Sequence, residues 1–421
     1  MEIDVHLGGS WQACARLTPP GAGEDLTFRY DAEYALRALE ARDNRAASVR
    51  LPVDLGVRRR SRWPSFLYDL LPGRAAQAAF RRCLDGPLDD WLLLAMGAAN
   101  PAGNLRVRPR ESRAKGSHAG FTLEQLIAQG ESFIDAASEA GASVAGATDV
   151  QGESPKFWII ETAEGRWLPD DGRQGTIAVR HALLKFPAPQ AGVHATDMLR
   201  HEAAYQRVAR RSGLSVGSVL PHFAAGALLS ARFDRRVESG REVRLGVESL
   251  CSVAGVSPRD ALGHCDALLA LHGCLSDFDG DLREYLRRDV LNLALGNRDN
   301  HGRNTAVLKD TDGSIRLAPL YDFGPTYLDE RPRARAMRWD GEATGAVDWR
   351  GILTNLAGRF ARHGRTLGDL RTIAADLREF SSDLARLPEL MLECGVDDWV
   401  VRQRRPAIAI LHRALGALEW P

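Results

Sequence analysis

The sequence predicts a mixed α/β (α+β) protein in which short strands dominate the first half and helices the second. Three observations support this prediction: the length of 421 residues, strand-like segments before about residue 235, and a mainly helical pattern from about residue 245 onward. A chain of this length exceeds one small domain, so we expect two or three packed units. The composition, with 44% apolar and 26% charged residues, is ordinary for a globular protein.

The first expected region, residues 1–112, begins with strands and ends in a loop. WQACARLT and DLTFRY are strand-like, and the segment PPGAGED between them is typical of a turn. A helix is expected to begin near Ala32, and a second helix is expected at DDWLLLAMGAA. Residues 101–120 return to a strand and then become loop-like, which places the first boundary there.

Two further regions are expected, residues 113–235 and 236–421. In the first of these, KFWIIETA and TIAVRHALLKF are strand-like, and LRHEAAYQRVARRSG has the pattern of an amphipathic helix. The last region is mainly helical, but a hairpin interrupts it after Asn304. TAVLK and SIRLAPL are the strands of this hairpin, and DTDG between them supplies an Asp-Gly turn.

Composition also argues against several classes of protein. The formal net charge is zero, which argues against bulk attraction to nucleic acid or an anionic membrane. No apolar run approaches the roughly 18 residues of a membrane span, and no signal peptide is expected after Met1. The six cysteines are scattered without a CxxC pair, so we expect free thiols in a reducing cytoplasm.

The segment LALGNRDNHGRN ends an apolar run in a cluster of polar residues. Taken alone, it fits a polar loop, a metal site containing Asp299 and His301, or a catalytic loop in which Asn304 follows Asp299 by five residues. The expected hairpin follows directly and leads into YDFG, residues 321–324. Protein kinases use this order of an aspartate, an asparagine, a hairpin and a DFG aspartate for phosphoryl transfer.

Lysine is scarce in this chain, since only four of the 55 basic residues are lysines. A compact ammonium group suits contact with phosphate in a tight site, so Lys156 and Lys185, next to strands, are candidate phosphate contacts. Glu202 lies in an amphipathic helix and is either a partner of Lys185 or an exposed helical glutamate. Lys115 and Lys309 are both expected to tolerate replacement by arginine. Lys309 lies beside an expected turn, so its position needs no explanation through phosphate contact.

Together these motifs resemble the HipA family of bacterial serine/threonine kinases, the toxin components of toxin–antitoxin systems. The resemblance covers almost the whole chain and is carried by DLTFRYDAEY, VRLPVDL, PSFLYDLLPG, GNLRV, DVQGESPK, ALLKF, ARFDRR, GNRDNHGRN and LAPLYDFG. It implies a kinase-like fold with an N-terminal mixed subdomain, a nucleotide-binding α/β region and an all-helical C-terminal lobe.

The resemblance also implies the cofactors and the role of each site residue. Asp299 would be the general base, Asn304 and Asp322 would hold Mg²⁺, and ATP would be the nucleotide. Ala231–Phe233 would bind adenine through backbone groups, and Lys185 would contact the phosphates under a loop from Gln151 to Lys156. The full set of implied nucleotide contacts is Gln151, Gly152, Glu153, Ser154, Pro155, Lys156, Lys185, Ala231, Arg232, Phe233, His301, Gly302, Arg303, Asn304, Tyr321 and Asp322.

The chain departs from the family pattern at three places. Asp149 stands where the family often has a serine that becomes phosphorylated, Ala231 replaces a frequent glutamate, and LGVESL only partly matches a segment of the form L-x-Q-E-D. The segment after Asp149 keeps Thr148 and Ser154 as other hydroxyl groups nearby.

The implied partners follow from the same resemblance. They are a protein substrate such as an aminoacyl-tRNA synthetase, whose phosphorylation arrests translation and growth, and a HipB-like helix-turn-helix antitoxin through which any DNA contact would be made. Two other classes of function stay open. One is a metal-dependent phosphohydrolase that uses Asp299, His301 and Asp322, and the other is a pseudokinase that acts as a binding module.

Overall fold

The computed structural model divides the chain into two compact units, each built from several segments. The first unit contains residues 1–189, 222–257 and 308–314, and the second contains residues 190–221, 258–307 and 315–421. The residues that the structure describes are 1–21, 25–41, 45–73, 77, 81, 87–108, 120–133, 135, 154–172, 177–187, 189–217, 222–331, 334–342 and 347–420.

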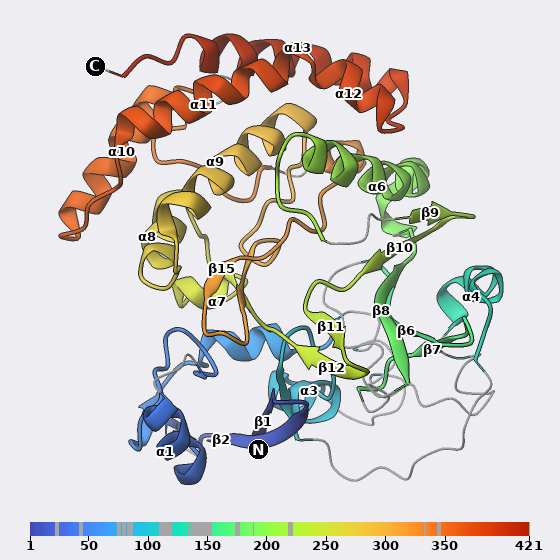
Figure 1. Cartoon of the computed structure of the whole chain (residues 1–421), viewed down its shortest axis with the longest axis vertical. Helices are drawn as coiled ribbons and strands as arrows, with labels where there is room; N and C mark the ends of the chain where they lie inside the picture. Colours follow the sequence, from blue (N-terminus) through green and yellow to red (C-terminus); the bar gives the residue numbers. More distant parts are fainter. Residues whose placement is uncertain are drawn as a thin grey trace. The chain divides into compact units, whose positions relative to one another are not determined.

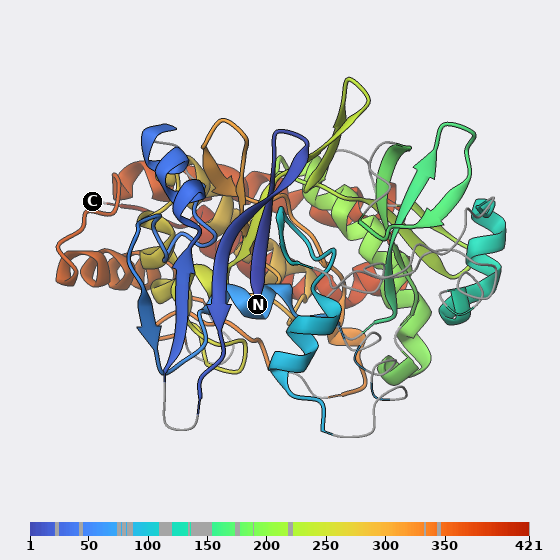
Figure 2. The same cartoon turned by 90° about the horizontal axis from the view of Figure 1, so that it is seen from below.

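The first unit begins with a five-stranded sheet of order β4-β3-β2-β1-β5. Its strands are β1 (Glu2–Leu7), β2 (Ser10–Thr18), β3 (Leu26–Tyr30), β4 (Arg58–Arg60) and β5 (Leu105–Val107), and the β1–β2 hairpin is visible in dark blue in Figure 2. Alternate residues of β2 and β3, such as Leu17 and Phe28, are fully buried, as expected for a sheet with one face on a core. The helices nearby in sequence are α1 (Ala32–Ala41), the 3₁₀ helix η1 (Ser65–Leu70) and α3 (Asp90–Gly97).

A second sheet of the first unit has the order β7-β6-β8-β10-β9. Its strands are β6 (Lys156–Thr162), β7 (Trp167–Pro169), β8 (Ala178–Lys185), β9 (His222–Ala224) and β10 (Ala227–Ala231). The rest of the unit consists of α4 (Leu123–Gln129), η2 (Gly130–Ser132), the hairpin β11 (Arg235–Glu238) and β12 (Arg241–Arg244), β13 (Gly246–Ser249) and α7 (Leu250–Ala254).

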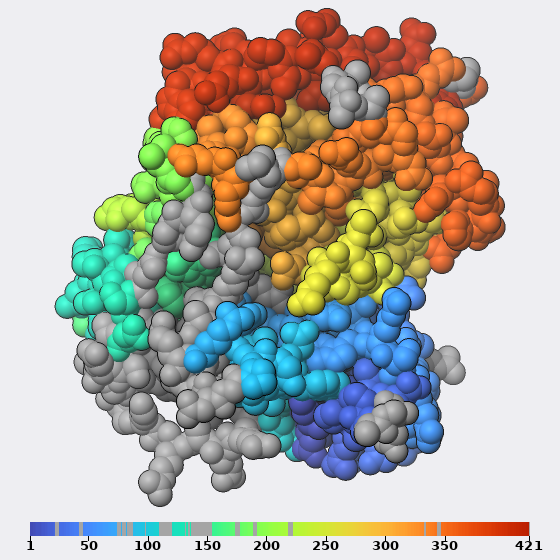
Figure 3. All heavy atoms as spheres, turned by 180° about the vertical axis from the view of Figure 1, so that it is seen from behind, coloured from blue at the N-terminus to red at the C-terminus, as the bar shows by residue number. Residues whose placement is uncertain are grey.

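The second unit is mainly helical and contains the candidate catalytic loop. Its elements are η3 (Pro189–His194), α6 (Ala195–Arg211), α8 (His264–His272), α9 (Phe278–Leu295), η4 (Thr326–Leu328), α10 (Trp349–Arg362), α11 (Leu370–Ala385), α12 (Leu387–Glu393) and α13 (Asp398–Gly416). Helices α11 and α13 run alongside each other and contact α9 (Figure 1). In the space-filling view, the red atoms of the C-terminal helices lie directly against the orange atoms of the segments before them (Figure 3).

The hairpin predicted after Asn304 is confirmed as β14 (Ala306–Lys309) and β15 (Ile315–Leu317). The strands predicted at WQACARLT, DLTFRY, KFWIIETA and TIAVRHALLKF are confirmed as β2, β3, β6 and β8, and the helix predicted near Ala32 is confirmed as α1. Within the part of the chain that the structure describes, no helix is both long and apolar enough to cross a membrane.

Candidate active site

The candidate catalytic loop begins where helix α9 ends at Gly296. Gly296 has a φ of 75°, and its amide donates to the carbonyl of Asn292, which is the usual left-handed end of a helix. A Cβ at this position would lie 2.6 Å from the Tyr327 ring, so only glycine fits. The direction in which the chain leaves α9 is therefore set by close packing.

Distant residues satisfy the last carbonyl groups of α9. The Arg404 guanidinium donates to the carbonyls of Leu293 (2.8 Å) and Ala294 (2.9 Å), and the Tyr205 hydroxyl donates to Leu295 (3.1 Å). A helix leaves its final carbonyls without partners inside the helix, so such donors anchor its end. Helices α6 and α13 thus hold the end of α9 from which the loop starts.

Within the loop, three of the predicted site residues lie close together. Asn304 donates its side-chain amide to the carbonyl of Asp299 at 2.8 Å, and the Nε2 atom of His301 lies 3.6 Å from Oδ1 of Asp299. The Asp299 side chain is 29% exposed, so a substrate hydroxyl can reach its carboxylate. The hydrogen bond from Asn304 to Asp299 joins residues five positions apart and closes the loop between them.

The loop electrostatics favour a neutral histidine beside the two carboxylates. Burial lowers the pKa of His301, the charge of Asp299 raises it, Arg303 lowers it and Asp322 raises it, and the balance is a lowered pKa. At neutral pH the imidazole is therefore uncharged and does not neutralise Asp299 or Asp322.

Asp322 has an uncommon backbone conformation directly after the hairpin. Its φ is 53°, in the left-handed region that residues with a Cβ rarely adopt. Among the described residues, the other non-glycine residues with positive φ are Ala225 and Ser239, and each precedes a glycine at a hairpin turn. Such an outlier away from a simple turn is typical of functional sites, where packing holds the side chain in place.

The residues after Asp322 are fixed by helix α6. The Phe323 ring is buried and lies 5.8 Å, centroid to centroid, from the ring of Tyr205. A Cβ on Gly324 would lie 3.4 Å from Cβ of Glu202, so the backbone passes close to this glutamate. Glu202 was predicted to be either a partner of Lys185 or an exposed helical glutamate. It is buried and lies against the DFG segment.

The DFG segment and the catalytic loop are bonded to each other. The Tyr321 hydroxyl donates to the carbonyl of Arg303 at 2.7 Å, and the Thr326 hydroxyl bonds to the start of the loop. The loop that carries Asp299 and Asn304 is therefore joined by hydrogen bonds to the segment that carries Asp322. Thr326 was missed in the sequence because an isolated threonine carries no motif.

The donor set fits Mg²⁺ better than a transition metal. Asn304 and Asp322 offer amide and carboxylate oxygens, which magnesium prefers. The amide nitrogen of Asn304 is engaged by Asp299, which leaves the amide oxygen to act as a ligand. In the described residues, no group of three or more His, Cys, Asp and Glu side chains has the arrangement of a metal site.

In the first unit, the two candidate phosphate-binding lysines are neighbours. Lys156 at the start of β6 pairs with Lys185 at the end of β8, and both are buried, with 7% of their surface exposed. Directly opposite residues on adjacent strands carry side chains on the same face of the sheet. Two cations of this scarce type are thus brought together at one end of the sheet.

The segment predicted to bind adenine lies on the neighbouring strand. Ala231 of β10 pairs with Ala182 of β8, three residues from Lys185, or roughly 10 Å along the strand. The Arg232 amide donates to the carbonyl of His181 at 3.0 Å, so that donor is already used. Phe233 follows at the end of the strand.

The side chain of Arg232 is part of a buried ionic network. It lies 3.8 Å above the Trp158 ring and pairs with Asp234 at 2.7 Å and Asp170 at 3.3 Å. Burial alone would raise the pKa of Asp234, but Arg232 and Arg235 outweigh it and hold that pKa well below its usual value. These ion pairs hold the Arg232 side chain in place just after β10.

The structure corrects the expectation for Lys309. Its ammonium group is buried and donates to Glu248 at 3.1 Å and to the carbonyls of Ala46 and Ala47 at 3.4 and 3.3 Å. A Cβ on Gly246 would lie 3.0 Å from Lys309, so the site has no room for a larger group. Replacement by arginine is therefore not expected to be neutral.

Glu248 lies in LGVESL, the segment that only partly matches the family pattern. It is 1% exposed, and it also accepts hydrogen bonds from Ser48 at 2.6 Å, Val49 at 3.0 Å and Ser252 at 2.7 Å. This glutamate therefore has a structural role in the first unit.

Some predicted residues lie outside the described part of the chain. These are Gln151, Gly152 and Glu153 of the phosphate-covering loop, together with Lys115, Thr148 and Asp149. Ser154 and Pro155, at the end of that loop, lead directly into β6.

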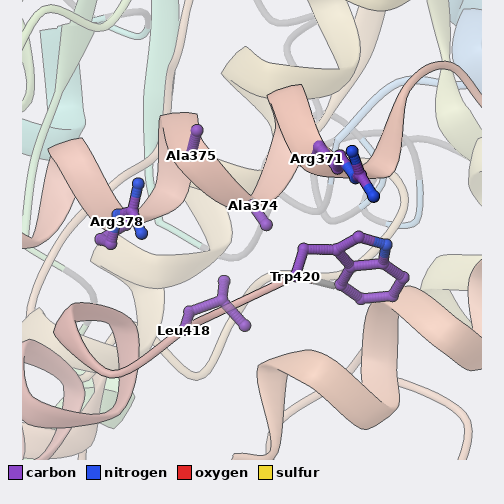
Figure 4. Close-up of a pocket in the computed structure, with 6 residues that line it drawn as sticks. All are labelled: Arg371, Ala374, Ala375, Arg378, Leu418 and Trp420. Atoms are coloured by element: carbon purple, nitrogen blue, oxygen red, sulfur yellow. The ribbon is translucent and has the colours of Figure 1, made fainter.

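A pocket of about 420 Å³ lies elsewhere in the second unit and involves none of the predicted site residues. Arg371, Ala374, Ala375 and Arg378 on α11 form one wall, and Leu418 and Trp420 face them from the C-terminal segment (Figure 4).

Comparison with known proteins points to one family. Residues 143–384 match the family model described as HipA-like C-terminal domain. A curated protein of Sinorhizobium fredii (strain NBRC 101917 / NGR234), named "Putative kinase Y4mE", is 31% identical over 182 residues, and the match spans 41% of this chain and about two fifths of that relative's length.

Among solved structures, the chain resembles one from a Shewanella oneidensis MR-1 complex of HipA, HipB and operator DNA. The TM-score is 0.67 at 19% identity, and the match covers 98% of this chain and 97% of that one. The predicted fold class is confirmed by this likeness.

Proposed function

Since the chain belongs to the family of HipA-like C-terminal domains, we propose that it is an ATP- and Mg²⁺-dependent protein serine/threonine kinase. The observation that carries this proposal is a pair of hydrogen bonds: Asn304 bonds to Asp299, and Tyr321, the residue before Asp322, bonds to Arg303, the residue before Asn304. Phosphoryl transfer depends mainly on positioning and on neutralising charge, and Asp299, Asn304 and Asp322 are the types of residue that it requires.

Each residue has a distinct part in the proposed reaction. The Asp299 carboxylate accepts the proton of the substrate hydroxyl as that oxygen attacks the terminal phosphorus of ATP, and the bond from this phosphorus to the bridging oxygen breaks to release ADP. Asn304 and Asp322 would hold Mg²⁺, which when bound neutralises charge on the phosphates. Lys156 and Lys185 would contact the phosphates with compact positive charges.

The paired lysines support a polyanionic ligand. Directly opposite lysines at one end of a sheet are placed to contact a ligand with several negative charges, such as a triphosphate. The backbone of Ala231–Phe233 would receive the base at a distance along the strand that a nucleoside triphosphate can bridge.

We also propose two macromolecular partners. One is a HipB-like helix-turn-helix antitoxin, because the resembling HipA chain is in a complex with HipB and operator DNA. The other is a protein substrate such as an aminoacyl-tRNA synthetase, whose phosphorylation would arrest translation and growth in the cytoplasm. Any DNA contact would be made through the antitoxin.

The proposal is tested by incubating the pure protein with Mg²⁺, a cell lysate and ATP labelled at its terminal phosphate. A labelled protein with phosphoserine or phosphothreonine supports kinase activity and identifies the substrate. Consumption of ATP with only inorganic phosphate released would support the phosphohydrolase, and failure to bind MgATP would support the pseudokinase.

A further inference from the structure

Thr326 lies four residues after Asp322 and joins the DFG segment to the start of the catalytic loop. Its hydroxyl oxygen accepts hydrogen bonds from the backbone amides of Arg298 at 2.7 Å and Asp299 at 3.3 Å. The same hydroxyl donates to Oδ1 of Asn297 at 3.1 Å. One donated and two accepted bonds use the whole hydrogen-bonding capacity of a hydroxyl group.

Asn297, which accepts from this hydroxyl, is itself bonded to helix α9. Asn297 donates its side-chain amide to Oδ1 of Asn292 at 2.9 Å, and its own Oδ1 also accepts from the Asp299 amide at 3.2 Å. The Asp299 amide is thus shared between Thr326 and Asn297. The chain of bonds runs from the body of α9 to the residue that carries the predicted base.

Thr326 is also held by backbone hydrogen bonds within the segment that follows Asp322. It begins the 3₁₀ helix η4. The Thr326 amide donates to the carbonyl of Gly324, before the helix, at 2.8 Å, and the Asp329 amide donates to the carbonyl of Thr326 at 3.3 Å. Gly324 is the residue that passes close to Glu202. A displacement of the DFG segment would therefore move the Thr326 hydroxyl and pull on the Asp299 backbone.

We infer that Thr326 is a positioning residue that keeps the base Asp299 in register with the metal-binding Asp322. This inference rests on the proposed kinase function, because it assigns Thr326 a role in the same site. The hydroxyl does not touch a substrate. It acts by fixing the backbone from which the Asp299 carboxylate extends, and small errors in such positions are costly in rate.

Two variants separate the hydroxyl from the shape of the side chain. Thr326→Val keeps the size and the β-branch but removes all three hydrogen bonds, and Thr326→Ser keeps the hydroxyl. We expect the valine variant to lower kcat about 10²-fold while the KM for MgATP stays close to that of the parent. The serine variant should retain most of the parent kcat.

Amide hydrogen exchange supplies a readout that does not depend on activity. The Arg298 amide should exchange faster in the valine variant and at the parent rate in the serine variant, since only serine keeps its acceptor. The Asp299 amide should change less, because the side chain of Asn297 still accepts from it. Faster exchange confined to these amides also shows that the rest of the variant is folded.

The outcomes distinguish this inference from the proposed function. A parent protein that transfers no phosphate would overturn the kinase proposal, and amide exchange would then decide alone whether Thr326 holds the loop. A valine variant with the parent kcat, or with parent exchange at both amides, would overturn the positioning role. Equal loss in the serine and valine variants would also overturn it, because the hydroxyl would not be the cause.

Discussion

Lys156 and Lys185 stand directly opposite each other on β6 and β8, and both are buried. Two ammonium groups are thereby concentrated at one end of a sheet in a chain that otherwise uses arginine almost throughout. A buried site of this type favours a ligand with several negative charges.

Replacement of Lys185 by arginine should reduce phosphoryl transfer at least tenfold, although the charge is kept. The planar guanidinium is larger than an ammonium group and fits poorly in a buried position beside Lys156. The measurement is kcat/KM for MgATP. Arg180→Lys is the matched control, since it exchanges the same two residue types on the same strand at a side chain that is 49% exposed and pairs with Glu161.

If Lys185→Arg and Arg180→Lys both kept the parent kcat/KM, the phosphate-binding role of Lys185 would be wrong.

Lys309 should affect stability instead of nucleotide binding. Lys309→Met leaves the buried carboxylate of Glu248 without its cation and should lower the free energy of unfolding by about 3–5 kcal/mol. Lys309→Arg overfills the space beside Gly246 and should cost about 1–3 kcal/mol. Urea denaturation measures both values, and the affinity for MgATP should be unchanged in the folded variants. Parent-like stability of Lys309→Met would contradict the structural role.

Much of the fold could be predicted from local patterns in the sequence. The alternation of WQACARLT and the Asp-Gly turn of the hairpin after Asn304 determined the corresponding elements. The catalytic loop and the DFG segment could be recognised because their residue types and spacing are required by phosphoryl transfer. The assignment of chemical roles to Asp299, Asn304 and Asp322 remains a prediction.

Contacts between residues far apart in the chain could not be predicted from the sequence. Lys309 and Thr326 are two examples. Glu248 lies 61 residues before Lys309, and no local pattern links the two. The scarcity of lysine is nevertheless a usable signal, because Lys309, like Lys156 and Lys185, is buried. Thr326 bonds to a residue 27 positions earlier, and this relationship depends on how the hairpin folds back.

Replacement of Asp322 by asparagine should weaken the binding of MgATP, because the change removes a negative charge from the predicted metal site. Calorimetry should give at least a tenfold higher Kd for MgATP, and a much smaller change for ATP in the presence of a chelator. Asp329→Asn is a control in the same segment, since Asp329 pairs with Arg331. Equal affinity for MgATP in Asp322→Asn and the parent would exclude Asp322 as a metal ligand.

The second unit should lose stability between pH 7 and pH 5 through His264. Burial lowers the pKa of this histidine to about 4 in the folded protein. It stacks on Trp339 and bonds to Tyr285 and Arg335. Because the unfolded chain binds a proton below about pH 6.5 that the folded chain does not bind, acidification to pH 5 should cost about 2 kcal/mol.

The pH dependence can be assigned with two variants. His264→Gln cannot take up the proton, so its free energy of unfolding should fall less between pH 7 and pH 5 than that of the parent. His363→Gln replaces an exposed histidine at the end of α10 and should leave the pH dependence unchanged. An identical fall in the parent and in His264→Gln would rule out His264 as its source.

The most direct test of the kinase assignment compares the parent with Asp299→Asn. Both proteins are first titrated with MgATP by calorimetry and then incubated with Mg²⁺, cell lysate and ATP labelled at its terminal phosphate. The parent should label a protein on serine or threonine, and Asp299→Asn should bind MgATP with similar affinity but give no labelled protein, because an amide cannot accept the hydroxyl proton. Equal labelling by the two proteins, or a parent that releases only inorganic phosphate, would contradict the assignment.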